Sequence, residues 1–188
     1  MTNAAEKTDQ IVNGINTGRI IELATTMSQQ SEFAKFRFQA NNDWIGGSRS
    51  RTSVKDFYAG NNERTERAKA LTIGADQPAF LGGENTAPNA VEHYLNSLVS
   101  CLSTTIVAHA SVQGIKIEAL AINAEGTMDA RGFFGVSEAV RRGYSKVKVG
   151  IKAKATTDEE TLRNLINYSP VYEMVSKALP VEVDIAVE

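Results

Sequence analysis

The sequence has little cysteine and little histidine. Cys101 is the only cysteine among 188 residues, so no internal disulfide can form and no oxidising compartment is implied. The two histidines, His93 and His109, fall sixteen residues apart on one expected helix, about 24 Å along its axis. With one cysteine and two distant histidines no Cys/His zinc site can form, and we expect neither a metal nor a cofactor.

The chain also lacks a basic excess, a targeting segment and a long apolar run. Its 20 Lys and Arg against 22 Asp and Glu give a net charge of −2, which argues against nucleic-acid binding. The N-terminus has no basic region followed by an apolar run, as a signal peptide would. The charge-free stretch from Tyr94 to His109 carries too many hydroxyl and amide groups to span a bilayer cheaply. We therefore expect a cytoplasmic protein with no membrane partner.

Hydrophobic periodicity predicts a helix, several strands, a long helix, two strands, two short helices and a final strand. The expected helices cover residues 4–28, 89–113, 156–168 and 169–179. The expected strands cover residues 33–40, 52–59, 67–75, 115–126, 146–155 and 180–188, with a polar turn at 41–51 and a loop at 75–89. In strand 146–155 the four lysines alternate with apolar residues, which indicates one exposed face and one buried face.

The order of these elements favours an α+β fold with antiparallel sheets. A helix at 89–113 that is almost free of charge must be covered nearly all round, by a sheet on one side and by something else, such as a second copy of the chain, on the other. Thr157, three residues before Glu160, predicts a capping box at the start of one short helix. Ser169 before Pro170 predicts the N-cap of the next.

Cys101 lies in the middle of the expected long helix. Buried free cysteines are commonly small apolar residues of a core, and the composition favours that interpretation. The alternative is a reactive thiol, since Ser97, Thr104 and Thr105 share its helical face and hydroxyls can donate to a thiolate. His109 is about 12 Å along the axis from Cys101, too far to be its direct base.

Two motifs resemble the OsmC/Ohr family of thiol peroxidases and their OsmC-like relatives. APNAVEHYLNSLVSCL is similar to the family segment in which Asn-Pro-x-Glu precedes a helix that carries a cysteine. NYSPVYEMVSKALPVEVDI is similar to its Cys-Pro-Val segment, short helix and final strand. The resemblance covers about residues 33–188, so we expect an N-terminal helical extension over 1–30 and an OsmC-like domain over 31–188. It implies an intertwined homodimer with antiparallel sheets wrapped around long central helices.

The resemblance also implies a chemistry. Cys101 matches the cysteine that attacks an organic hydroperoxide and becomes a sulfenic acid. In the family a second cysteine resolves this acid as a disulfide, which an external dithiol reduces, while a Glu and an Arg hold the thiolate and polarise the peroxide. Glu92 and Arg49, the latter in a GGSRSR segment similar to the Ohr-type turn, are the residues that match those roles, with Arg51 the next choice.

The sequence departs from the family pattern at several positions. Ser169 stands where the resolving cysteine is expected, and Ala90 where the motif has proline. The peroxidases place Glu ten residues before the cysteine, where this chain has Val91, and Glu92 is nine residues before it. Nine helical residues separate Glu92 from Cys101 by about 13.5 Å and about 180°, so Glu92 could serve only the cysteine of a partner chain. Glu92 in a first helical turn also suits the helix dipole, and Arg49 could be a solvated turn residue.

Two functions remain open from the sequence. The first is a one-cysteine thiol peroxidase in which Cys101 reduces organic hydroperoxides and an external thiol restores it, as part of an oxidative-stress defence. The second is a non-catalytic protein that holds a small hydrophobic ligand at the dimer interface, with Cys101 in the wall of the pocket. The missing second cysteine and the shifted glutamate favour the second.

Overall fold

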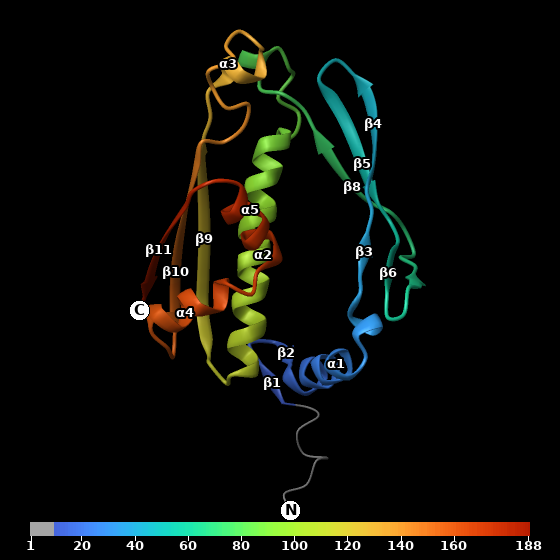
Figure 1. The fold of residues 1–188 in the computed structure, drawn as a ribbon, viewed down its shortest axis with the longest axis vertical. Helices are drawn as coiled ribbons and strands as arrows, with labels where there is room; N and C mark the ends of the chain where they lie inside the picture. The colour runs from blue at the N-terminus through green and yellow to red at the C-terminus, as the bar shows by residue number, and fades with distance from the viewer. Residues whose placement is uncertain (1–9) are drawn as a thin grey trace, which may run out of the picture. The chain divides into compact units, whose positions relative to one another are not determined.

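The computed structural model describes residues 10–188, so the part of the expected N-terminal helix on residues 4–9 lies outside the described range. The chain divides into two compact units (Figure 1). The first, called here the sheet–helix unit, contains residues 94–188 together with the described residues 10–18. The second, called here the 19–93 unit, contains the residues between them. Each unit is described by itself.

The sheet–helix unit is built on a three-stranded sheet in the order β11-β10-β9. Its strands are β9 (Ile117–Thr127), β10 (Lys146–Ala155) and β11 (Val181–Val187). Its helices are α2 (Ala90–Val112, whose first four residues belong to the other unit), α3 (Ala130–Phe133), α4 (Glu159–Ile166) and α5 (Pro170–Ala178). In Figure 1 α2, α4 and α5 lie on one side of the sheet. The expected α+β class with a long helix and antiparallel sheets is therefore confirmed.

The core of this unit follows from two periodicities. In α2 the buried apolar residues recur every four positions, at Leu98, Leu102, Ile106 and Ala110, and form one stripe. In β10 alternate residues from Val147 to Ala153 are buried while the lysines between them are exposed, as the alternation predicted. The helical stripe and one face of the sheet thus form the apolar interior.

Helix α2 is long and apolar enough to cross a membrane by length and composition alone. The core helix of a water-soluble protein passes the same test, which makes this weak evidence. Here the helix buries its stripe within its own unit, beside a sheet whose other face carries lysines.

One strand pair of the sheet is parallel. β10 pairs with β9 in the antiparallel sense and with β11 in the parallel sense, with Val147 opposite Val181. A parallel neighbour requires a crossover connection, because the chain must return to the same end of the sheet. Helices α4 and α5 supply that crossover between β10 and β11.

The expected helix over 4–28 is wrong over residues 11–16, which form a hairpin. β1 (Ile11–Val12) and β2 (Ile15–Asn16) pair antiparallel around Asn13 and Gly14, whose φ angles are 51° and 79°. Asn-Gly between apolar residues is the strongest short hairpin signal, since a type I′ turn needs positive φ at both positions. The later part of the expected helix is confirmed as α1 (Thr17–Gln29).

The side chain of Asn13 bonds this hairpin to the end of α2 and the start of β9, within the sheet–helix unit. Its amide nitrogen donates to the Ser111 hydroxyl at 3.0 Å and to the Ile115 carbonyl at 2.9 Å, and its oxygen accepts from the Ile117 amide at 2.9 Å. One amide thus joins the end of α2 to the start of β9.

Replacing Asn13 with glycine is expected to destabilise the protein by about 1–3 kcal/mol, because glycine keeps the positive φ but removes these bonds from partly buried partners. Chemical denaturation checks this. The control is Asn164→Ala, which removes an asparagine side chain at an exposed position of α4 and should change stability little. Alanine is used there because a glycine would itself weaken the helix. Equal stability of Asn13→Gly and wild type would contradict the role given to the amide.

The 19–93 unit contains two small antiparallel sheets in the orders β4-β5-β8 and β3-β6-β7. Its strands are β3 (Arg37–Phe38), β4 (Asn41–Gly46), β5 (Arg49–Val54), β6 (Phe57–Ala59), β7 (Glu63–Thr65) and β8 (Leu71–Ala75). Short 3₁₀ helices cover Ser31–Ala34 and Ala79–Leu81.

Two expectations for this unit are corrected. The strand expected over 33–40 is reduced to β3, because a 3₁₀ turn occupies its first residues. The polar turn expected over 41–51 is a hairpin of β4 and β5, and only the residues around Gly46 and Gly47 turn, with φ of 119° and 59°. Polar residues at 41–43 hid the strand, because they lie on an exposed edge where side chains need not be apolar.

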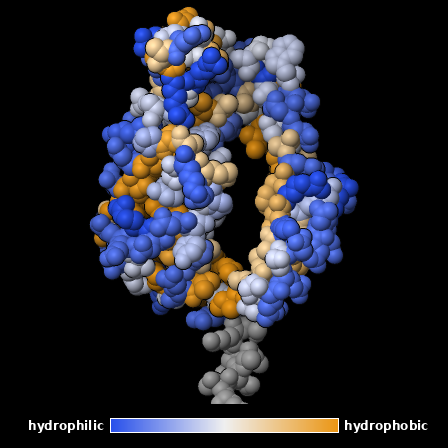
Figure 2. All heavy atoms as spheres, in the orientation of Figure 1, coloured by the Kyte–Doolittle hydropathy of each residue, from blue (hydrophilic) through white to orange (hydrophobic). Residues whose placement is uncertain are grey.

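One face of the β4-β5-β8 sheet presents large apolar side chains to solvent. The pairing places Trp44, Leu71 and Ile73 on the same face, and they are 75%, 52% and 45% exposed. Hydrophobic residues gather along one side of this unit in Figure 2. Large exposed apolar side chains that share one face of a sheet are typical of an interaction face.

Candidate functional site

Cys101 lies near the middle of α2 and is half-buried. Its sulfur accepts a hydrogen bond from the hydroxyl of Ser169, with 3.1 Å between Sγ and Oγ. The two residues are 68 positions apart in sequence, and Ser169 is fully buried. The fold therefore brings the only thiol of the chain against the residue that stands where the resemblance implied a second cysteine.

Ser169 is the N-cap of α5, as its place before Pro170 predicted. Its hydroxyl oxygen accepts from the Tyr172 amide at 3.2 Å, and Pro170 occupies the first turn, where it costs no hydrogen bond. The capping box expected at Thr157 is wrong by one residue. Asp158 caps α4 instead, accepting from the Thr161 amide at 2.8 Å, and carboxylates are at least as good N-caps as threonine.

The hydroxyls expected beside Cys101 on its own helix are used in part elsewhere. The Thr104 hydroxyl donates to the backbone carbonyls of Ser100 and Cys101, both at 3.1 Å. This back-bonding is common for threonine within helices. The hydroxyl that the structure places on the sulfur comes from Ser169, across the unit, and sequence spacing along α2 could not reveal it.

Glu92 lies in the first turn of α2, in the 19–93 unit. Its carboxylate accepts from the Asn89 amide at 2.8 Å, and the Asn89 side chain accepts from the Glu92 amide at 2.9 Å. This reciprocal arrangement is a capping box, in which two free amides of the helix start are satisfied. The interpretation of Glu92 as a first-turn residue that suits the helix dipole is confirmed.

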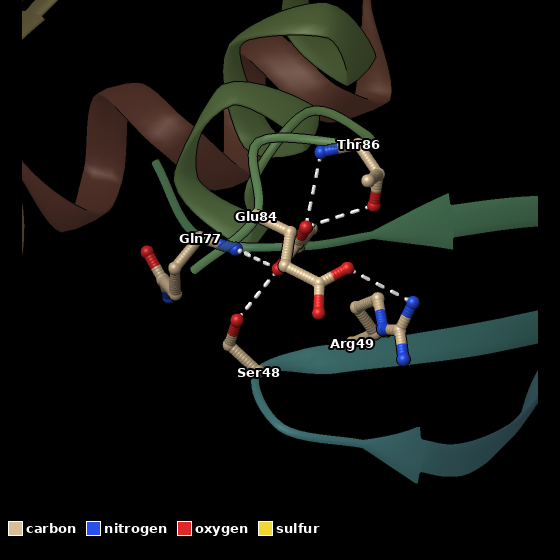
Figure 3. A network of polar contacts seen from close by, with 6 residues as sticks. Ser48, Arg49, Gln77, Glu84 and Thr86 are labelled. Atoms are coloured by element: carbon tan, nitrogen blue, oxygen red, sulfur yellow. Dashed lines mark hydrogen bonds and ion pairs between the residues drawn. The ribbon is translucent and has the colours of Figure 1, made fainter. Parts of the chain in front are cut away.

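Arg49 opens β5, next to the hairpin turn of the 19–93 unit. Its Nη1 forms an ion pair with Glu84 at 3.0 Å (Figure 3). Its Nε is buried and has no hydrogen-bond partner among residues 10–188. A buried donor without an acceptor is costly, and such groups mark positions where a further acceptor is expected. The Arg49 side chain is thus partly exposed and ion-paired through Nη1, while its Nε is buried.

A buried carboxylate, Asp76, holds the surroundings of Arg49 in place. Asp76 is 2% exposed and accepts from the Ser48 hydroxyl at 2.5 Å, the Gln77 amide at 2.8 Å, and the Thr86 amide and hydroxyl at 3.0 Å and 2.8 Å (Figure 3). The Ser48 hydroxyl and then the Thr86 amide lower the pKa of Asp76 far below its ordinary value, against the effect of burial.

These bonds join three segments of the 19–93 unit. Ser48 precedes Arg49, and Thr86 follows Glu84 by two residues, so Asp76 fixes the backbone beside both members of the Arg49–Glu84 pair. The sequence offered no signal for this carboxylate, because its donors come from positions 48, 77 and 86 and follow no local motif.

The two histidines have separate surroundings. A ring nitrogen of His93 lies 2.8 Å from the Gly74 carbonyl and ties the start of α2 to β8. His109 stacks on Tyr168 with ring centroids 4.2 Å apart. Within residues 10–188 no group of three or more His, Cys, Asp or Glu side chains is arranged to hold a metal ion.

Comparisons with known proteins place these features in context. The family model described as OsmC-like protein matches residues 83–185, more than half of the chain and the part that carries both Cys101 and Ser169. A search of curated proteins finds no match.

Solved structures share the fold. A putative osmotic stress induced and detoxification response protein from Psychrobacter arcticus is 21% identical, covers 78% of this chain and 94% of its own, and has a TM-score of 0.57. An organic hydroperoxide resistance protein OsmC from Legionella pneumophila is 19% identical, with coverages of 80% and 98% and a TM-score of 0.52. An organic hydroperoxide resistance protein from Elizabethkingia anophelis is 14% identical, with coverages of 80% and 97% and a TM-score of 0.54. At these identities the likeness shows the fold alone.

Proposed function

Because the chain belongs to the OsmC-like protein family, we propose that it is a thiol peroxidase that reduces organic hydroperoxides through Cys101 alone. The observation that carries this proposal is the hydrogen bond from Ser169 to the Cys101 sulfur at 3.1 Å. The thiolate is the reactive form of cysteine, and a hydrogen bond to the charged form favours it. Cys101 is also half-buried rather than fully buried, which supports access of a substrate to this residue.

The proposed reaction balances as follows. The Cys101 thiolate attacks the distal oxygen of the hydroperoxide; an S–O bond forms, the O–O bond breaks, and the alkoxide leaves as an alcohol after taking up a proton. The resulting sulfenic acid reacts with an external thiol, which releases water and leaves a mixed disulfide. A second external thiol attacks this disulfide and restores Cys101. Ser169 has no sulfur to replace the external thiol, so the cycle needs two reducing thiols from outside.

We assign Arg49 and Glu92 the supporting roles in a homodimer. Along α2, Glu92 and Cys101 are about 13.5 Å apart and on nearly opposite faces, so Glu92 would act on the cysteine of the partner chain. The exposed apolar face around Trp44, Leu71 and Ile73 supports a second copy as the surface that covers it. The buried Nε of Arg49, which has no hydrogen-bond partner among residues 10–188, supports the choice of this arginine for the role.

The non-catalytic alternative also has specific support. The Glu92 carboxylate is engaged at the helix start with Asn89, and Arg49 is paired with Glu84. Under this alternative a small hydrophobic ligand lies at the dimer interface and Cys101 is a wall residue. For either function we propose a cytoplasmic location, as expected from the sequence.

One experiment separates the two functions. The reduced protein is mixed with one equivalent of cumene hydroperoxide, and Cys101 is followed by intact mass in the presence of a dimedone-type sulfenate trap. The proposal expects fast, saturable adduct formation. Arg49→Ala should slow it by at least about tenfold, because the role proposed for Arg49 is to donate to the charge that develops in the reaction.

The matched control is Arg142→Ala, which removes an exposed arginine of the sheet–helix unit and should leave the rate unchanged. Oxidation of wild-type Cys101 no faster than that of glutathione would leave only the binding function. If Arg51→Ala slows the reaction and Arg49→Ala does not, the arginine assignment moves by two residues.

A further inference from the structure

The Ser169 hydroxyl has a fixed direction. A hydroxyl carries one proton to donate and two lone pairs that accept. One lone pair takes the Tyr172 amide at 3.2 Å, which completes the N-cap of α5, and the proton is donated to Cys101 Sγ at 3.1 Å. Because Ser169 is 0% exposed, bulk water does not compete for this proton. The two bonds therefore orient the hydroxyl toward the sulfur.

The backbone on both sides of Ser169 is also tied. Its amide donates to the Ile166 carbonyl at 3.0 Å, and its carbonyl accepts from the Glu173 amide at 3.0 Å. Pro170 fixes the next φ angle. A donor held this firmly needs no reorganisation when negative charge develops on the sulfur.

The Cys101 sulfur lies beside the N-cap of α5, so the dipole of that helix also stabilises negative charge on the sulfur. α5 has nine residues, and the amides of its first turn are the positive end of the helix dipole. Cysteines at helix N-termini are reactive for this reason, although here the cysteine belongs to α2 and only its sulfur lies beside α5.

We propose that Ser169 is a positioning residue for the chemistry of Cys101: its hydroxyl is a buried, fixed donor that favours the thiolate over the thiol. This inference deepens the proposed function: the role of Ser169 in catalysis rests on Cys101 being the peroxidatic thiol. It gives the serine at this position a task of its own, in addition to capping α5. The residue acts through Cys101 and is not required to touch the substrate.

The test uses iodoacetamide, which alkylates thiolates and involves no peroxide. The rate of Cys101 alkylation is measured against pH by intact mass for wild type and Ser169→Ala. We expect alkylation of the variant at pH 7 to be about tenfold slower, as the loss of a hydrogen bond to a charged group implies, with the same plateau rate at high pH. An unchanged plateau shows that access to the sulfur is the same and only its ionisation has changed.

Two further variants at Ser169 test whether the hydroxyl itself is responsible, and a third variant is the control. Ser169→Thr keeps the hydroxyl and should restore the wild-type profile. Ser169→Gly also removes the hydroxyl, but glycine at an N-cap costs little stability, so it tests the inference if Ser169→Ala does not fold. Asp158→Ala removes the cap of α4, which lies away from the sulfur contact, and should leave the alkylation profile unshifted.

The outcomes distinguish this inference from the proposed function. Superimposable profiles for wild type, Ser169→Ala and Ser169→Gly would overturn the inference even if hydroperoxide oxidises Cys101 quickly. A shifted profile in a protein that hydroperoxide oxidises no faster than glutathione would support the Ser169 contact and defeat the peroxidase proposal.

Discussion

Ser169→Cys is expected to form an internal disulfide with Cys101 as soon as the protein meets an oxidant. The Ser169 oxygen lies 3.1 Å from the Cys101 sulfur, so a thiol at this position needs only a small approach to reach the S–S bond length of about 2.05 Å. The Cys101 sulfenic acid would be attacked by the new thiol, with release of water, and the oxidised variant would be lighter than the reduced one by two hydrogen atoms.

The disulfide should also change how the protein is reduced. In wild type an external thiol must attack a sulfenic acid. The variant instead presents a disulfide. An external dithiol such as dithiothreitol attacks this disulfide, and its own second thiol then resolves the mixed disulfide and frees both protein thiols. After one equivalent of hydroperoxide, the dimedone-type trap should label wild type almost completely and Ser169→Cys hardly at all.

Ser176→Cys is the matched control, because it adds a thiol to the same helix at a residue whose hydroxyl bonds to the Glu173 carbonyl and not to Cys101. It should still accumulate trapped sulfenate. If Ser169→Cys also remains fully trapped, the two side chains do not meet in solution as they do in the structure.

The elements that the sequence predicted well have strong, uninterrupted periodicity. The helix expected at 89–113 is α2 at Ala90–Val112, and the strand expected at 146–155 is β10 with the same ends. In both, burial of one face decides the structure, and the residue pattern records that burial directly. Short elements with mixed composition, such as β4, were missed because tertiary pairing rather than local pattern makes them strands.

The N-terminal hairpin shows a different limit. Ile11, Ile15 and the later apolar residues fit helical spacing and predict a helix, whereas Asn13-Gly14 is a hairpin turn signal that this spacing does not take into account. Two competing local signals were present, and the choice between them depends on Ser111, Ile115 and Ile117, which bond to Asn13 from about a hundred residues away. No local reading of the sequence contains that information.

The sequence predicts which residues belong to the candidate site, but not the long-range contacts that they make. The family resemblance predicts Cys101, Glu92 and Arg49 as site residues, and the place of Glu92 at the start of the long helix predicts its first-turn position. The contact of Cys101 with Ser169 and the bonds of Asp76 are both long-range, formed by side chains that the fold brings together. Spacing along the chain gives the elements on which such residues lie, but not which of them meet.

Asp76→Asn is expected to be among the most destabilising single substitutions in the 19–93 unit. The carboxylate accepts four hydrogen bonds with its two oxygens, and an amide would turn an NH₂ group toward one set of donors, from Ser48 and Gln77 or from Thr86. Unpaired buried donors are costly, and we expect the melting temperature at pH 7 to fall by about 5 °C or more. Asp43→Asn, at an exposed position of β4 in the same unit, should change it little.

The stability that Asp76 contributes should depend on pH in a definite direction. The pKa of Asp76 in the folded state lies far below its ordinary value of 3.8, first because of the Ser48 hydroxyl and then the Thr86 amide. Its contribution to stability is therefore fully present above pH 3.8 and is lost as the pH falls through the folded-state pKa. The melting temperatures of wild type and Asp76→Asn, measured from pH 7 down to pH 2, should approach each other once the pH falls below 3.8, because the stability that ionised Asp76 contributes shrinks there.

The same substitution tests what Asp76 does for Arg49. If Asp76 holds Ser48 and Thr86 so that Arg49 and Glu84 stay aligned, then Asp76→Asn should slow hydroperoxide oxidation of Cys101 at a temperature well below its melting point, and Arg49→Ala should add little to that loss. Fully additive effects of the two substitutions would mean that the Asp76 network stabilises the unit without positioning the arginine.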